Sequence, residues 1–307
     1  MNFNKKYDVK KIVIYLLGIM FVTLGLGTLI LFGTGANFIK GIKPNHTVDY
    51  TKTSNLNGIN EIDVDASSAT INIIPDVTSQ VKTHFYGDVT ASNNSTKPEI
   101  QCYKSGSTLV IKEVNKTHIS FGFFSSNVKL DVHIPSDYNK DIKLSSSSGD
   151  ININDYKFNK LKCDLSSGSL NIRNVNADTF NYSNSSGNLK ADKLSTKNTT
   201  LDSSSGSINI STFSGDLTSE SSSGDCNIQY ANFHNNIDMS SSSGKIELTL
   251  PESAQFDLDA EASSGDITCN FPITVSGKNE HKLRGIVVND NNKIKLDASS
   301  GDIKILH

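Results

Sequence analysis

Serine is the residue type in this sequence that most readily suggests chemistry. The tripeptide Ser-Ser-Gly occurs eight times among the 307 residues, and a serine close to glycines is the nucleophile of many hydrolases. A serine becomes nucleophilic only beside a base that a third group holds in place. No histidine or aspartate is placed to activate one copy alone. We therefore expect a structural role for the repeated serines, and we predict that the protein is not an enzyme.

Acidic residues often follow the glycine of this tripeptide, as at Asp150, Asp225, Asp266 and Asp302. Evenly spaced carboxylates can bind calcium, but the Gly-Gly-x-Gly-x-Asp motif of calcium-binding solenoids is absent, and Lys245 takes the same position in one copy. The seven histidines and the four cysteines match no zinc-binding spacing. We predict solvated polar turns at these positions, with no metal and no cofactor.

The glycines of the tripeptide define an internal repeat of about 19 residues. They are Gly149, Gly168, Gly187, Gly206, Gly224, Gly244, Gly265 and Gly301, at steps of 19, 19, 19, 18, 20, 21 and 36 residues. The longest step covers two periods, with Gly285 as a degenerate copy, and Ala69 takes the glycine position of an upstream copy. Glycine permits a sharp bend where a Cβ atom would clash, so these residues are predicted to form one corner of every repeat.

Apolar and polar residues alternate on both sides of each glycine, which predicts two strands with one buried face. The positions two and four residues after the glycine are apolar, as in Ile151 and Ile153, and so are the positions five and seven residues before it, as in Leu144 and Ile142. Nineteen residues are too few for a strand and a crossover helix. We predict an all-β fold, a single-stranded β-solenoid-like stack in which each coil pairs with the next.

Three of the four cysteines fall in these inward-facing columns. They are Cys163, Cys226 and Cys269, and we predict that they are buried free thiols, with disulfide bonds as the alternative. Cys102 lies outside the clear repeats, and its position assigns it no role.

An apolar segment near the N-terminus predicts a membrane anchor. Residues 12–32 run for 21 residues without a charge, which is roughly 31 Å of helix and matches the thickness of a bilayer core. Four lysines and one aspartate precede this segment, and this excess of positive charge places the N-terminus in the cytoplasm. The alternative is a cleaved signal peptide, whose apolar region would be shorter.

These patterns divide the chain into four predicted parts. Residues 1–11 form a basic cytoplasmic segment, residues 12–33 a transmembrane helix, residues 34–57 a polar linker, and residues 58–307 an extracytoplasmic β-repeat domain. The strands of residues 58–136 are less regularly spaced, so this part is predicted to be the irregular N-terminal cap of the domain.

Several segments of this domain resemble one bacterial protein family. Residues 62–73, residues 128–135 and residues 294–305, together with the Ser-Ser-Gly-Asp-Ile ladder between them, are similar to the bacterial "putative adhesin" domain family, a LiaG-like domain of unknown function. The resemblance covers residues 58–307. It implies a β-repeat domain on the cell surface, and it carries over no catalytic residues.

The leading functional hypothesis is a non-enzymatic, membrane-anchored protein of the cell envelope that presents a rigid β-repeat surface for binding or scaffolding. Its partner would be a cell-wall component or another membrane protein, and the net charge of −3 without a basic stripe argues against nucleic acid. The alternatives are a regulatory partner of an envelope-stress sensor and a glycan-active solenoid enzyme. For an enzyme, the break in the repeat at His281, Lys282 and Arg284 is the first place to look.

Overall fold

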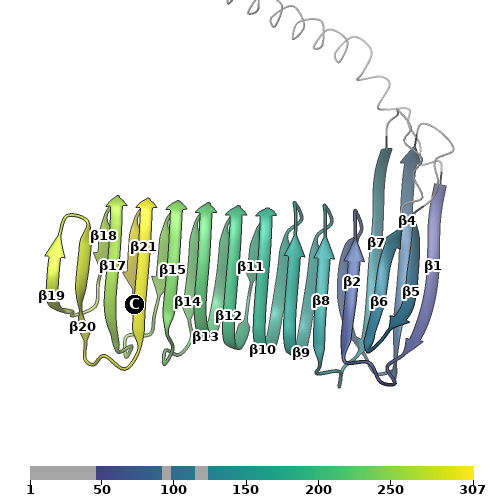
Figure 1. The fold of residues 1–307 in the computed structure, drawn as a ribbon, viewed down its shortest axis with the longest axis horizontal. Coiled ribbons are helices and arrows are strands. Elements are labelled where there is room, and N and C mark those ends of the chain that lie inside the picture. Colours follow the sequence, from purple (N-terminus) through teal and green to yellow (C-terminus); the bar gives the residue numbers. More distant parts are fainter. Residues whose placement is uncertain (1–45, 92–97, 115–123) are drawn as a thin grey trace, which may run out of the picture. The chain divides into compact units, whose positions relative to one another are not determined.

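The computed structural model describes residues 46–91, 98–114 and 124–307 of the chain. All the regular secondary structure in these residues is β-strand, from β1 to β22, which confirms the all-β prediction (Figure 1). The predicted cytoplasmic segment, transmembrane helix and the first part of the linker lie outside the described residues. The described part contains no helix with the length and apolar character needed to cross a membrane.

The strands form two long walls that meet at a shared corner, and each coil contributes one strand to each wall. Wall A holds the coil strands that run up to the corner, together with the end strands that extend the same sheet. In stack order it consists of β5 (Glu99–Ser105), β6 (Thr108–Val114), β2 (Glu61–Ala66), β8 (Asp141–Ser146), the second parts of β9 (Ile151–Leu165), β10 (Leu170–Ser186), β12 (Leu194–Ser205) and β13 (Ile208–Ser223), then β15 (Ile237–Ser243), β21 (Lys293–Ser300), β17 (Phe256–Ser264), β20 (Lys282–Val287) and β19 (Thr274–Asn279).

Wall B holds the coil strands that leave the corner, together with the end strands that extend the same sheet. In stack order it consists of β1 (His46–Asn55), β4 (Gln80–Ala91), β7 (Phe124–Pro135), β3 (Thr70–Asp76), the first parts of β9 and β10, β11 (Leu189–Ala191), the first part of β13, β14 (Cys226–Tyr230), β16 (Ile246–Thr249), β22 (Ile303–Leu306) and β18 (Ile267–Cys269). The middle of β9 and β10 and the start of β12 line a shorter third side.

Neighbouring coils in the middle of the stack pair in parallel and in register with the repeat. Ile151 pairs with Leu170, and Leu170 pairs with Leu189, so each inward column continues from coil to coil. The members of these columns, such as Leu144 and Ile153, are fully buried. The alternation read from the sequence therefore corresponds to one continuous core between the walls.

The 18-residue step between Gly206 and Gly224 is absorbed by a bulge. Two residues of β12, Thr196 and Lys197, lie opposite the single residue Gly215 of β13. Gly215 has a φ of 136°, and a Cβ atom there would overlap the hydroxyl of Thr196. A missing residue in one coil thus leaves the corners aligned, because the irregularity is confined to the opposite side of the coil.

The C-terminal coil does not follow the order of the sequence. Strand β21 lies between β15 and β17, and β22 lies between β16 and β18, so the coil of Gly301 is inserted between those of Gly244 and Gly265. The prediction that each coil pairs with the next is wrong here. Gly285 is not a degenerate corner, because it lies in β20 of the antiparallel hairpin β19–β20. This hairpin pairs with β17 and extends wall A beyond the last coil.

The N-terminal end is also reordered. Strands β6 and β7 form the outermost coil, and the coil of β2 and β3 lies between it and the coil that begins with β8. Antiparallel strands complete this end, with β5 on wall A and β4 and β1 on wall B. Residues 58–136, predicted as an irregular cap, therefore contain one regular coil and one end coil.

The linker predicted for residues 34–57 is wrong for its second half. Residues 46–55 form β1, which pairs with β4 over ten residues without interruption. Val48 is buried in the core, and the ring of Tyr50 stacks on that of Phe85 at 6.4 Å. The segment shows only two inward apolar residues among threonines and charges, because β1 is an edge strand with most of its length exposed to solvent.

Candidate binding surface: the serine corner

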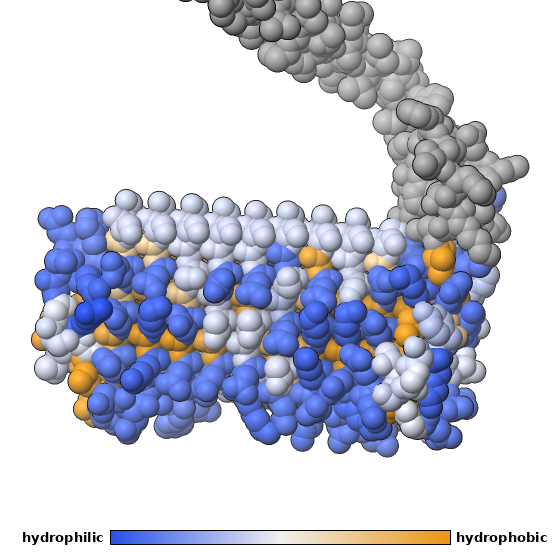
Figure 2. Space-filling model, in the orientation of Figure 1, coloured by the Kyte–Doolittle hydropathy of each residue, from blue (hydrophilic) through white to orange (hydrophobic). Residues whose placement is uncertain are grey.

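The corner shared by the two walls carries two exposed serines in each coil. We call this surface the serine corner, and it is visible as a pale band along the upper edge of the stack in Figure 2. In stack order its serine pairs end at Ser68, Ser148, Ser167, Ser186, Ser205, Ser223, Ser243, Ser300 and Ser264. Because neighbouring strands lie about 4.8 Å apart, the hydroxyl groups form two straight rows with that spacing.

The glycine after each serine pair sets how closely the coils approach at the corner. A Cβ atom on Gly168 would overlap the carbonyl oxygen of Gly149, and a Cβ atom on Gly206 would overlap that of Gly187. The same overlap occurs at all eight predicted corner glycines, each against the coil on its N-terminal side in the stack. Gly206 and Gly224 also have positive φ angles of 114° and 113°. Glycine is therefore required by the contact between backbones at every corner and by conformation at some of them.

Ala69 occupies the corner position in the coil of β2 and β3, and the structure explains the exception. Its N–H group donates at 3.2 Å to the carboxylate of Glu113 in β6, a residue that is 4% exposed. At the eight later corners a Cβ atom on the glycine would instead overlap a backbone carbonyl oxygen of the neighbouring coil. Alanine therefore stands at the one corner of the series that contacts Glu113.

Glu113 completes the hydrogen bonds of the first corner. In the coils that follow, corner serine N–H groups donate to the preceding coil, as Ser148 N does to Ser67 O at 3.0 Å. In the coil of β2 and β3 the carboxylate of Glu113 accepts from the backbone N–H groups of Ser67, Ser68 and Ala69 at 2.8, 3.0 and 3.2 Å. The Ser68 hydroxyl donates to its second oxygen at 3.0 Å. Sequence inspection missed this residue, because its single copy stands outside the repeat.

A column of carboxylates and serines runs along the outer face of wall A, beside the serine corner. In stack order it contains Asp65, Ser145, Asp164, Ser183, Asp202, Glu220, Ser240, Asp297 and Glu261. Four of the six carboxylates make ion pairs, with Lys112, Lys162, Lys295 and Lys282 in stack order of the coils, at 2.6 to 3.1 Å. Exposed pairs of this kind contribute little to stability, but they cancel the charge locally.

Asp202 and Glu220 differ from the rest of this column. They lie directly opposite each other on β12 and β13, both exposed, and neither makes an ion pair or a side-chain hydrogen bond in the described residues. The position two residues earlier, which is lysine in several other coils, is Thr200 and Thr218 here. Like charges placed opposite each other on paired strands repel, and no neighbouring cation offsets the repulsion.

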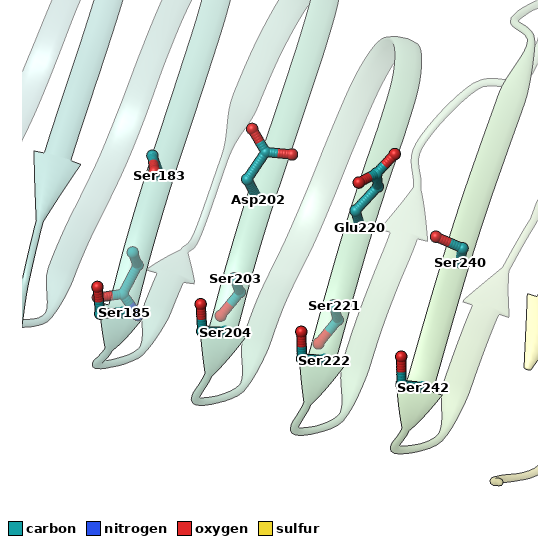
Figure 3. Close-up of a pocket in the computed structure, with 11 residues that line it drawn as sticks. Ser183, Ser185, Asp202, Ser203, Ser204, Glu220, Ser221, Ser222, Ser240 and Ser242 are labelled. Carbon is teal, nitrogen blue, oxygen red and sulfur yellow. The ribbon is translucent and has the colours of Figure 1, made fainter. Parts of the chain in front are cut away.

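These two carboxylates lie in a shallow groove of about 350 Å³ on wall A. Figure 3 shows them on neighbouring strands above Ser204 and Ser222 of the serine corner, with Ser183 and Ser240 on either side. The groove is therefore lined by hydroxyl groups and two unneutralised carboxylates. The sequence signal for it is threonine, in place of lysine, two residues before each of the two carboxylates.

Acidic residues after the glycines accept hydrogen bonds from backbone N–H groups of the neighbouring coil. Asp150 accepts a hydrogen bond from Ser169 N at 2.9 Å, and Asp225 accepts one from Lys245 N at the same distance. Each side chain thus connects its coil to the next coil of the stack. The described residues contain no group of three or more histidine, cysteine, aspartate or glutamate side chains arranged to hold a metal ion.

The break in the repeat that carries His281, Lys282 and Arg284 forms the hairpin β19–β20. Lys282 pairs with Glu261 at 2.6 Å, and Arg284 pairs with Asp259 at 2.7 Å. The bond from the Arg284 guanidinium lowers the pKa of the Asp259 carboxyl. The backbone carbonyl of His281 accepts from Ala262 N, which ties the hairpin to β17. These contacts hold the hairpin against β17.

The cysteines differ in burial and all four are free thiols. Cys163 and Cys226 are buried in the core as predicted, and burial raises the pKa of the Cys226 thiol to about 12. Cys269, predicted to be buried, is only half-buried because it lies in the outermost coil of wall B. Cys102 is half-buried in β5, 3.8 Å from the Thr83 hydroxyl.

The Toastrack DUF4097 family model matches residues 59–306, which is most of the chain and all of the stacked coils. The chain belongs to this family. The resemblance to bacterial "putative adhesin" domains is thereby confirmed, and the Toastrack fold is β-solenoid-like, in agreement with the stack. No curated protein sequence matches the chain.

Solved structures similar to this Toastrack protein share little of its sequence. One is described as a putative adhesin from Bacteroides fragilis, with 14% identity over 87% of this chain and 100% of its own, at a TM-score of 0.47. A second is described as a putative lipid binding protein from Parabacteroides distasonis, with 13% identity over 85% and 98% and a TM-score of 0.44. A third, a putative cell adhesion protein from Clostridium sporogenes, has 15% identity over 85% and 99% and a TM-score of 0.28.

Replacing Gly206 by alanine should destabilise the Toastrack domain by at least ~2 kcal/mol. The added methyl group would overlap the Gly187 carbonyl oxygen, and it would occupy a backbone conformation with φ of 114° that alanine disfavours. The free energy of unfolding in urea, measured on the full chain, tests this. Gly277→Ala is the matched control, because a Cβ atom there meets nothing within 4 Å and should change stability by less than ~0.5 kcal/mol. Equal effects of the two substitutions would contradict the proposed role of the corner.

Replacing Glu113 by alanine should destabilise the N-terminal end of the stack by ~3 kcal/mol, because three backbone donors, one buried and two partly buried, lose their charged acceptor. Glu113→Gln should have a smaller effect, since its amide oxygen can still accept. Hydrogen exchange of the Ser67, Ser68 and Ala69 amides reports the change directly. If these amides stay protected in the alanine variant, Glu113 is not the acceptor that completes the corner.

Proposed function

We propose that this Toastrack protein is a non-enzymatic, membrane-anchored protein of the bacterial cell envelope that presents its repeating β surface for binding or scaffolding. The observation that carries the proposal is the serine corner with the adjacent groove of Asp202 and Glu220. Its hydroxyl groups are held at one regular spacing by backbone contacts that leave the corner little freedom. Such a surface suits a ligand that is itself repetitive.

The chemistry of the groove defines the ligand class. Rows of serine hydroxyls can donate and accept hydrogen bonds, which complements the hydroxyl groups of a glycan. The unneutralised pair of Asp202 and Glu220 favours a ligand that also carries positive charge, because a cation would relieve the repulsion between the two carboxylates. The proposed ligand is therefore a repetitive, polyhydroxylated envelope polymer with amino groups.

The same two carboxylates are the observation that favours a glycan-active enzyme as the second candidate. Retaining glycosidases hold two carboxyl groups about 5–5.5 Å apart, close to the spacing of paired strands. A general acid of this type needs an environment that keeps it protonated, usually burial in an apolar pocket. Asp202 and Glu220 are both exposed, so the geometry favours binding over hydrolysis.

The anchor and the orientation of the chain follow from the apolar segment at residues 12–33 and the lysines before it. The β domain would then lie on the outer side of the cell membrane, where envelope polymers are within reach. Protease added to intact cells should degrade the β domain and leave an N-terminal fragment in the membrane. A β domain that resists protease until the cells are broken would contradict this orientation, and a mature chain lacking the segment would show cleavage.

Removing the two unneutralised carboxylates should weaken binding to the envelope polymer at least fivefold. The full chain in mild detergent is incubated with insoluble cell-wall glycan, and the bound fraction is measured at low and high salt for the double variant Asp202→Asn, Glu220→Gln. The matched control is Asp164→Asn, which lies in the same column but pairs with Lys162 in the native chain, and which should bind within twofold of the native protein.

The outcomes of this experiment separate the candidate functions. Salt should weaken binding of the native chain and have little effect on the double variant, because only the native groove carries uncompensated charge. Binding that is equal in all three proteins would reject the groove as the site. Soluble sugar fragments released by the native chain, and not by the double variant, would replace the binding proposal with the enzyme.

A further inference from the structure

The two walls end at different coils at the C-terminal end of the stack, and we call this offset the step. Wall A continues past the last coil with β20 and β19, whereas wall B stops at β18. Figure 1 shows the β19–β20 hairpin at the end of the stack farthest from β1. Two strands of wall A therefore have no opposite strand in wall B, at a spacing of about 4.8 Å per strand.

The core columns end unfinished at this step. The positions two and four residues after the corner are buried in every coil except the outermost, where Ile267 and Cys269 are only half-buried. Ile273 is also half-buried, and Val275 of β19 is 48% exposed. Apolar side chains that are covered everywhere else in the stack thus face solvent at one place.

The N-terminal end shows what a finished end looks like. Strand β4 pairs with β7 at this end of wall B, and its own side chains Val81, Phe85 and Val89 are buried. The edge strands β1 and β5 contact each other across the end. In contrast, no residue of β19 is buried. The chain therefore closes one end of its core and leaves the other to be closed by something else.

The charges at the step are unpaired and of opposite sign. Three of the four aspartates that follow a corner glycine accept from the next coil, as Asp302 accepts from Asp266 N at 3.1 Å. The fourth, Asp266, has no further coil to contact. Lys278 of β19 lies opposite the buried Leu283 of β20, so it shares the face of the hairpin that points across the step. Within the described residues, neither Asp266 nor Lys278 makes an ion pair.

We propose that a second copy of this chain closes the step, by docking of the two C-terminal ends about a twofold axis. The hairpin β19–β20 of each copy covers Ile267 and Cys269 of the other, and Lys278 of each copy pairs with Asp266 of the other. A two-strand overhang beside a two-strand recess is complementary to a copy of itself, which is the requirement for an isologous interface.

Simple edge-to-edge pairing of β19 with its copy is disfavoured. Strand β19 has a bulge between Val275 and Gly277, and it carries the inward lysine. Bulges and inward charges are devices that prevent open-ended strand pairing. In the twofold docking this lysine forms an ion pair. Assembly stops at two copies, because the step of each copy is covered by the other.

Sedimentation velocity of the full chain in mild detergent over a hundredfold concentration range tests the docking. The native chain should convert from monomer to dimer. Lys278→Asp and Asp266→Lys should each weaken the dimer at least tenfold, because each places like charges together. The double variant should return to within about threefold of the native affinity, since the pair is restored with its signs exchanged.

A matched control and a second readout keep the result interpretable. Lys160→Asp reverses an exposed lysine in the middle of the stack and should leave the dimer unchanged. Alkylation of Cys269 should slow as the native chain dimerises, while Cys163 stays protected in every variant that is folded. A chain that is monomeric at all concentrations, a dimer that ignores both single reversals, or a double variant as weak as the singles would each overturn the proposal.

Discussion

The fold depends on one close approach, in which the backbones of neighbouring coils touch at the serine corner. The Cα atom of each glycine lies so near the preceding coil's glycine carbonyl that any side chain would collide with it. This contact lets the chain turn sharply between walls A and B while both walls keep regular strand pairing. The apolar columns on either side of the corner can then stack directly over one another, so burial follows from the corner and not the reverse.

The two ends of the stack differ in how the backbone groups of the end corners are satisfied. At the first corner the carboxylate of Glu113 accepts the hydrogen bonds of three backbone N–H groups, including that of Ala69. At the last corner nothing comparable is present, and Asp266 keeps a carboxylate that its counterparts use to bind the next coil. Parallel strands with an open edge attract other chains, so the difference between the two ends bears on what the protein binds.

Stacking also means that a change at one position of the repeat alters the charge or polarity of a whole column on the surface. A residue at one position of the repeat lies beside its equivalents in the coils above and below, so charges and hydroxyl groups add up along columns. Where lysines accompany the carboxylates, as Lys162 accompanies Asp164, the column is neutral; where threonines replace them, Asp202 and Glu220 remain as a local excess of negative charge. A functional surface can arise in this way without any residue that looks exceptional in the sequence.

Much of the fold was determined by the sequence alone, because it depends on local periodicity. The 19-residue spacing of the glycines, and the alternation around residues such as Leu144 and Ile151, predicted the corner, the strands and the buried faces. What only the tertiary structure decided was the order of the coils at both ends, the strand β1, the hydrogen bonds of Glu113, and the absence of ion pairs at Asp202 and Asp266 in the described residues. Period and face are properties of a few neighbouring residues, whereas the insertion of β21 between β15 and β17 is settled by which arrangement leaves the fewest strand edges and apolar side chains exposed. That competition involves residues far apart in the chain, and no local pattern records its outcome.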